Sequence, residues 1–184
     1  EMAKTMPSLD NITWERIEEE NSVTYPCNSP TAKGEEVVFG DKFPIEGGKG
    51  KFVPANVISP DEMPDKEFPM ILTTGRQLEH WHTGAMTRKA SNLDAIEPEA
   101  TISLSPKDVQ SINIQSGALI EVSTRRGSIK IKVREDRSIP EGVIFMPFCY
   151  KEAAVNLLTN SALDPFGKIP EFKYCAAKID VVNR

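Results

Sequence analysis

The chain has 184 residues, of which 39% are hydrophobic and 27% charged, and this composition is typical of a soluble globular protein. Its length suits one domain of ordinary size with an appended segment and excludes a second large catalytic domain. A net charge of -5 and an isoelectric point near 5.2 argue against nonspecific nucleic-acid binding, which requires a basic surface. The apolar runs are far shorter than the roughly 20 residues that span a bilayer, and no basic-then-apolar leader opens the chain.

The N-terminus and the cysteines of the chain indicate whether it is a fragment and in which compartment it is expected. It begins at Glu1 without an initiator methionine, so we expect it to be a piece of a longer polypeptide. Cys27, Cys149 and Cys175 are widely spaced and form no CxxC pair, which favours reduced thiols over a disulfide framework or a zinc site. We therefore expect a cytoplasmic protein.

Residues 1–67 are predicted to be an irregular arm. They are rich in proline and carry a Gly-Gly-Lys-Gly run, and acidic residues outnumber basic ones two to one. An amphipathic turn at residues 12–20 and a strand-like stretch at residues 51–58 are the only candidates for regular structure. After Phe68 basic residues are in slight excess, so any anionic ligand is expected to bind this second part.

Residues 68–184 read as a folded domain built mainly of strands. Short apolar runs predict strands at residues 69–74, 101–104, 142–148 and 174–182. Residues 118–124 and 128–134 flank Arg-Arg-Gly and predict a hairpin, whose second strand alternates apolar and basic side chains. Capping residues predict a helix at 106–113, and an apolar turn predicts another at 152–158. About six strands with short helices indicate a closed or nearly closed β-barrel.

The segment after the first predicted strand carries the most chemistry. Residues 73–88 read TTGRQLEHWHTGAMTR. Gly75 allows a ligand to approach the main chain, and Arg76 offers two donors to a phosphate. His80 and His82 flank Trp81, but they lack a nearby third ligand, which argues against a metal site. Residue chemistry alone also allows a solvated loop around the tryptophan.

Asn156 is the second candidate, because it lies in an otherwise apolar turn where an amide needs a hydrogen-bond partner. The residues alone favour a buried asparagine bonded to backbone, and the alternative is a ligand contact.

The segment at residues 74–83, with Met-Thr-Arg at 86–88, resembles the signature of the C-terminal domain of molybdopterin-dependent oxidoreductases of the dimethyl sulfoxide reductase superfamily. The similarity is strongest to formate dehydrogenase catalytic subunits and periplasmic nitrate reductases. It continues through STRRG at 123–127, PEGVIFMPF at 140–148, NLLT at 156–159, DP at 164–165 and PEFK at 170–173. In the arm, MP at 6–7, ITWER at 12–16, YPC at 25–27 and GKGKFV at 48–53 resemble the segment that precedes this domain in formate dehydrogenases.

The resemblance implies a six-stranded double-psi β-barrel that binds the dinucleotide part of a bis(molybdopterin guanine dinucleotide) cofactor carrying Mo or W. It places cofactor contacts on Thr74, Gly75, Arg76, Gln77, Leu78, Glu79, His80, Trp81, His82, Thr83, Phe148, Asn156 and Lys173. The metal-ligating residue, the catalytic residues and the cysteines of a [4Fe-4S] cluster belong to parts of the family that this chain lacks. We therefore expect no catalytic or metal-binding residue here, and no turnover by this chain alone.

The resemblance leads to one main hypothesis, the C-terminal domain of a formate dehydrogenase that oxidises formate to carbon dioxide. Its expected partners are the remaining domains of the same polypeptide and electron-transfer subunits, without nucleic-acid or membrane contacts, and the isolated chain is expected to be a monomer. The alternatives are the same domain of a periplasmic-type nitrate reductase and a stand-alone barrel that acts as a binding module. A self-processing decarboxylase cleaved at Gly127-Ser128 is disfavoured, because glycine is expected in a hairpin turn.

Overall fold

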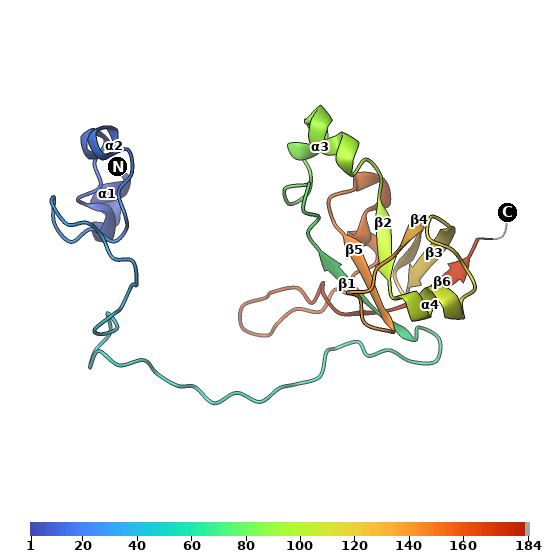
Figure 1. The fold of residues 1–184 in the computed structure, drawn as a ribbon. Coiled ribbons are helices and arrows are strands. Elements are labelled where there is room, and N and C mark those ends of the chain that lie inside the picture. Colours follow the sequence, from blue (N-terminus) through green and yellow to red (C-terminus); the bar gives the residue numbers. More distant parts are fainter. Residues whose placement is uncertain (183–184) are drawn as a thin grey trace. The chain divides into compact units, whose positions relative to one another are not determined.

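A computed structural model describes residues 1–182 and divides the chain into two compact units, residues 1–56 and the residues from 57 onward (Figure 1). The boundary predicted from composition, between residues 67 and 68, lies just before the first barrel strand, whereas the contacts group residues 57–67 with the barrel. Each unit is described separately.

The first unit contains α1 (Met2–Thr5), η1 (Pro7–Leu9) and α2 (Trp14–Glu20). Thr13 caps α2 by accepting a hydrogen bond from the Arg16 amide, and Asn21 ends it in the left-handed conformation. The Arg16 side chain binds the carbonyl oxygen of Ala32 at 2.6 Å and thereby ties the following loop to the helix. The helices of this unit bury no residue, and Cys27 is its one buried side chain, so the unit has almost no apolar core.

The strand predicted at residues 51–58 is wrong. This stretch adopts no regular structure, and Phe52 and Val57 are fully exposed. Its apolar residues find no partner strand, and an unpaired strand does not satisfy its backbone donors and acceptors.

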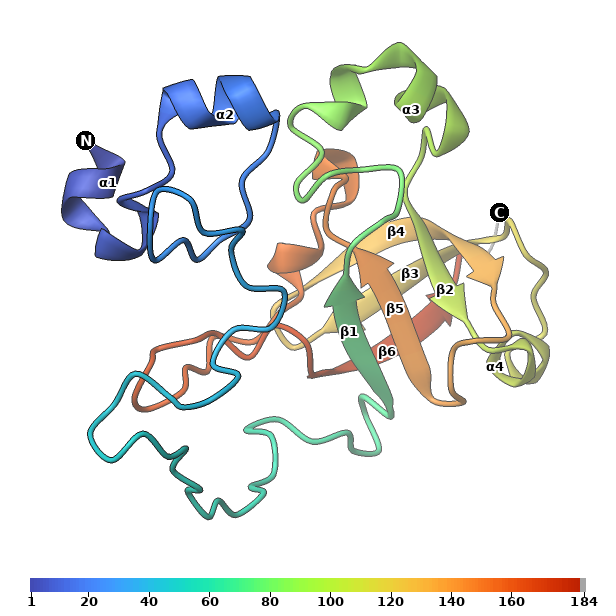
Figure 2. The ribbon, with the colours of Figure 1, turned by 60° about the vertical axis from the view of Figure 1, so that its left-hand side comes forward.

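The second unit is a closed barrel of six strands, as the sequence predicted (Figure 2). They are β1 (Met70–Gly75), β2 (Thr101–Leu104), β3 (Leu119–Thr124), β4 (Gly127–Glu135), β5 (Val143–Pro147) and β6 (Cys175–Val181), in the closed order β1-β5-β2-β4-β3-β6. β1 pairs with β5 and β2 with β4 in parallel, and the other neighbours are antiparallel. Leu72, Ile102, Ile120 and Ile144 lie in the fully buried core.

Short helices close the ends of the barrel. α4 (Pro106–Ser111) starts at Ser105, whose hydroxyl accepts a hydrogen bond from the Asp108 amide, as predicted. It ends two residues earlier than expected, because Asn113 turns into the left-handed region. The sequence did not predict η2 (Thr87–Lys89) or α3 (Ser91–Ile96), neither of which buries a residue.

The helix predicted at residues 152–158 is instead two separate turns, η3 (Lys151–Ala153) and η4 (Val155–Leu157). Ala154 between them has extended backbone. Ala153 and Val155 are both buried, yet residues two apart face opposite sides of a continuous helix. Breaking the helix lets both side chains reach the core.

Candidate functional site

The predicted site residues lie on segments that meet at one end of the barrel. Parallel pairing brings the carboxyl ends of β1 and β5 together, with Gly75 opposite Pro147. β6 runs antiparallel to β1, so the chain before Cys175 enters at this same end, and the β3–β4 turn lies there too. Figure 2 shows the arrowheads of β1 and β5 pointing to the end that carries α3, while β2 points to α4. The segments that carry Arg76, Asn156 and Lys173 therefore meet at one end of the barrel.

Contacts between Thr74 and residues 172–173 join two of these segments directly. The Thr74 hydroxyl donates to the carbonyl of Phe172 at 3.0 Å, and Lys173 Nζ donates to the carbonyl of Thr74 at 2.9 Å. Thr74 is buried, so its side chain serves this junction. Lys173 is exposed and retains two further N–H donors, which leaves an ammonium charge at the mouth of the barrel.

The loop after β1 presents polar groups around an open hollow of about 560 Å³, lined by Arg76, Gln77, Leu78, Glu79, His80, Trp81, His82, Thr87 and Leu93. Arg76 is exposed, and its Nη2 lies 3.5 Å from Nε2 of His82. The Trp81 ring stands edge-on to His82 with centroids 4.7 Å apart. Leu78 is almost fully exposed, and Gln77 donates to Glu79 at 2.6 Å, which lowers the pKa of that carboxyl.

Gly75 has a packing reason to be glycine. A Cβ atom at this position would come within 2.3 Å of the Phe145 ring on the neighbouring strand. The glycine at the end of β1 therefore allows β1 and β5 to pack closely, and ligand approach is not needed to explain it.

His80 differs from His82, because it is buried inside the loop. It is only 2% exposed, and its Nε2 donates to the carbonyl of Glu97 at 2.8 Å. The hydroxyl of Tyr150 donates to the same carbonyl at 3.1 Å, and the two rings pack edge to face. Nδ1 of His80 is buried without a partner among the described residues. Although the resemblance places His80 among the cofactor contacts, its ring connects the loop to α3 and to the segment after β5.

Arg88 supports the same region and was not predicted as a site residue. It donates to Asp94 at 2.6 Å and to Glu152 at 2.8 Å, and its guanidinium lies over the Tyr150 ring at 4.7 Å. Burial raises the pKa of the Tyr150 phenol well above its usual value, so this side chain stays neutral. Arg88 lies in the segment that resembles the family, but the sequence does not reveal its partners, which lie in α3 and in the segment after β5.

Phe148 and Asn156 carry the site onto the segment after β5. Phe148 packs against the core and donates its amide to Gly75, so one side of its ring belongs to the barrel. Asn156 is exposed between the buried Val155 and Leu158. Among the described residues no group hydrogen-bonds to its amide, so the buried, backbone-bonded asparagine that residue chemistry favoured is not what the structure shows. Thr83 is likewise exposed, next to the cavity beside Arg88.

Together these groups give this end of the barrel the chemistry that an anionic, polar ligand would need. Exposed guanidinium, ammonium, imidazole and amide groups from Arg76, Lys173, His82 and Asn156 are suited to phosphate and to the polar edges of a base. Within residues 1–182 no three His, Cys, Asp or Glu side chains gather as metal ligands would. No helix in the same range has the length and apolar character needed to cross a membrane.

Comparison with known proteins gives consistent matches. Residues 70–176 match the family model described as "Molydopterin dinucleotide binding domain". Over 98% of its length the chain is 42% identical to the F420-dependent formate dehydrogenase subunit alpha of Methanocaldococcus jannaschii. Over 99% it is 37% identical to the F420-dependent formate dehydrogenase 1 subunit alpha of Methanococcus maripaludis. The chain spans 27% of each of these relatives.

Among solved structures, acetylene hydratase from Pelobacter acetylenicus aligns with a TM-score of 0.57 and 25% sequence identity. The alignment covers 64% of this chain and 19% of that structure. Together with the strand order, this likeness supports the double-psi barrel predicted from the sequence.

Proposed function

The chain belongs to the family of molybdopterin dinucleotide-binding domains, and from this premise we propose that the barrel end described above holds the guanine dinucleotide part of the cofactor in a formate dehydrogenase. The observation that carries the proposal is the convergence of the segments bearing Arg76, Asn156 and Lys173 at one end of the barrel. All three side chains are exposed there, and those of Arg76 and Lys173 are cationic.

The residues present fit such a group. Arg76 can donate two parallel hydrogen bonds to a phosphate, and Lys173 adds a second positive charge next to the end of β1. The Asn156 amide offers both a donor and an acceptor, which suits the polar edge of a pterin or guanine. His82 and Thr83 add further donors, and the exposed face of Trp81 is available for stacking.

The proposed division of labour is that this chain binds and orients, while reaction chemistry occurs elsewhere. When bound, the cofactor supplies the two-electron redox chemistry. We propose bis(molybdopterin guanine dinucleotide) with Mo or W as the cofactor, and an iron–sulfur cluster in a part of the complete protein outside this chain. The complete protein is proposed to be an F420-dependent formate dehydrogenase, because the two curated relatives described above carry that name.

The partners follow from the same proposal. The exposed apolar side chains of Leu157 and Phe166 on the barrel unit are expected to contact the remaining domains of the complete polypeptide. Electron-transfer subunits would contact those other domains.

Nucleotide analysis of the complete polypeptide tests the proposal. Acid hydrolysis of the purified protein is expected to release GMP in stoichiometric amounts, and Arg76→Ala is expected to lower the retained amount severalfold. Formate oxidation is expected from the same preparation. Protein without bound guanine nucleotide, or a full complement in Arg76→Ala, would contradict the assignment of the site.

A further inference from the structure

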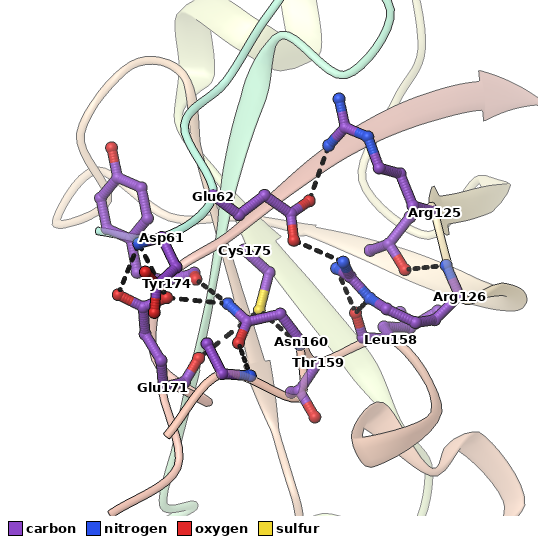
Figure 3. Close-up of polar contacts among 12 residues, drawn as sticks. Asp61, Glu62, Arg125, Arg126, Leu158, Thr159, Asn160, Glu171, Tyr174 and Cys175 are labelled. Carbon is purple, nitrogen blue, oxygen red and sulfur yellow. Dashed lines mark hydrogen bonds and ion pairs between the residues drawn. The ribbon is translucent and has the colours of Figure 1, made fainter. Parts of the chain in front are cut away.

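A polar cluster outside the proposed contact residues links four segments of the barrel unit (Figure 3). It joins the chain before β1, the β3–β4 turn, and the two segments that lead into and out of the loop at residues 160–173. Its central members are Glu62, Arg126 and Asn160, which we call the brace. None of the three was among the predicted cofactor contacts.

Arg126 holds the end of η4. Its Nε and Nη2 both donate to the carbonyl of Leu158, at 3.1 and 2.9 Å. Leu158 is fully buried and directly follows η4, where backbone carbonyls lose their helical partners. The close approach of the turn is also visible at Gly127, where a Cβ would lie 3.6 Å from the Leu157 carbonyl. Arg126 thus fixes η4 against the β3–β4 turn.

Glu62 in turn fixes Arg126. One of its carboxylate oxygens accepts from Arg125 at 2.8 Å, and the other accepts from Nη1 of Arg126. The Glu62 side chain is 13% exposed, so this carboxylate is largely withdrawn from water and depends on its two cationic partners. The paired charges restrict the rotamers of Arg126 and keep its remaining donors directed at Leu158.

Asn160 extends the brace to the segment before β6. Its Nδ2 donates to the carbonyl of Tyr174 at 3.1 Å and to Glu171 at 3.0 Å, while its backbone amide donates to Sγ of Cys175 at 3.2 Å. Asn160 lies four residues after Asn156, and Tyr174 directly follows Lys173. The exit of η4 is therefore bonded to the backbone beside Lys173.

We propose that Glu62, Arg126 and Asn160 are positioning residues that set the spacing between Asn156 and Lys173, and so hold the ligand face in its binding geometry. This inference rests on the proposed function. Asn156 lies between two buried anchors, Val155 and Leu158, so the position of η4 sets where its side chain leaves the backbone. Arg126 is the polar group that fixes η4 at the end nearest the β3–β4 turn. Preorganisation of this kind reduces the ordering cost of ligand binding.

The neighbouring arginine provides a matched control. Arg125→Met and Arg126→Met each remove one ion pair to Glu62, but only Arg126 contacts Leu158. The experiment uses the complete polypeptide purified with its cofactor. The retained protein is separated by ultrafiltration at intervals and hydrolysed in acid, and the remaining GMP per polypeptide gives a rate of cofactor loss. This readout does not depend on enzymatic activity.

We expect Arg126→Met to lose its bound guanine nucleotide about fivefold faster than wild type. The effect is limited to this size because Arg126 acts on the cofactor only by positioning Asn156, and Asn156 contributes about one hydrogen bond. Arg125→Met should remain within about twofold of wild type, since it leaves Leu158 held. In an Asn156→Ala background, Arg126→Met should add less than a twofold effect, because the group through which it acts is already gone. A purely structural role would instead give multiplying effects in the double variant.

The outcomes separate this inference from the proposed function. If the wild-type protein holds no guanine nucleotide, the proposed function is contradicted, and the role proposed for the brace is contradicted with it. Wild-type protein that holds guanine, with equal rates of loss for Arg125→Met and Arg126→Met, would overturn the brace alone. Multiplying effects in the double variant would also overturn it. If Arg126→Met does not accumulate as folded protein, Arg126→Lys makes the same comparison, because one ammonium cannot reproduce the paired donors to Leu158 and the bond to Glu62. It should lose guanine at a rate between those of wild type and Asn156→Ala, and a wild-type rate would count against the brace.

Discussion

Replacing His80 by alanine is expected to destabilise the barrel unit, whereas the same change at His82 is not. The two histidines are two residues apart in one loop, but His80 is 2% exposed and His82 lies on the surface. His80→Ala removes the 2.8 Å hydrogen bond to the Glu97 carbonyl, worth about 1 kcal/mol. It also leaves a cavity beside Tyr150, at a cost of about 2 kcal/mol.

Part of this loss is offset, because the wild-type Nδ1 is buried without a partner among the described residues and the variant removes it. The Glu97 carbonyl also keeps its bond from the Tyr150 hydroxyl. The net loss in the free energy of unfolding is therefore about 2 kcal/mol for His80→Ala and below about 0.5 kcal/mol for His82→Ala.

Urea unfolding of the 184-residue chain, followed by circular dichroism at neutral pH, measures both values. Equal losses for the two variants, or a loss below about 0.5 kcal/mol for His80→Ala, would refute the structural role assigned to His80. Tyr150→Phe is a second check, with an expected loss of about 1 kcal/mol from the missing hydroxyl.

Three further predictions concern protonation, thiol reactivity and local stability. Hydrogen bonds from the Ser138 hydroxyl and amide lower the pKa of Asp136 below its ordinary value of 3.8. The ionised carboxylate therefore stabilises the folded state above pH 3.8, and this stabilisation is lost as the pH falls through the lower pKa of the folded state. The urea midpoint of wild type should therefore fall more steeply below pH 3.8 than that of Asp136→Asn, and parallel curves would count against this. Burial raises the pKa of the Cys149 and Cys175 thiols, so Ellman's reagent should label them only in urea, and rapid labelling of either in the native chain would contradict their burial. Because its helices bury no residue, the unit at residues 1–56 should exchange its amide hydrogens faster than the barrel strands, and uniform protection of both units would show the prediction to be wrong.

Much of the barrel was predictable because its strands carry local signals. Ile129, Ile131 and Val133 alternate with basic residues, and they lie in β4 with their side chains buried. Ser105 and Pro106 marked the start of α4 for an equally local reason. α3 was missed because it has no side-chain N-cap hydrogen bond to mark its start. Arg88, which binds Asp94 within it, is itself held by Glu152, 64 residues further along the chain. The break in the helix at Ala154 was missed because it depends on Ala153 and Val155 both being buried, which only the tertiary structure shows.

The candidate site was predicted as a set of residues, but the sequence did not separate the side chains that hold the loop from those that face outward. The loop motif and its polar residues were visible in the sequence, and the topology places them with Asn156 and Lys173 at one end of the barrel. Whether each side chain faces outward depends on tertiary contacts. His80 is buried by Tyr150 and by the carbonyl of Glu97, and Thr74 is committed to Phe172. Arg126 and Glu62 read as ordinary hairpin and linker charges until their shared contact is seen.

Hydrogen exchange of the complete polypeptide, compared between protein purified with its cofactor and protein made in cells that cannot synthesise it, tests the central claim most directly. The cofactor should slow exchange at residues 74–83, 155–159 and 172–174. It should leave residues 106–116 unchanged, because α4 lies at the opposite end of the barrel (Figure 2). Slower exchange around α4, or none at the three named segments, would contradict the claim that this end of the barrel holds the dinucleotide.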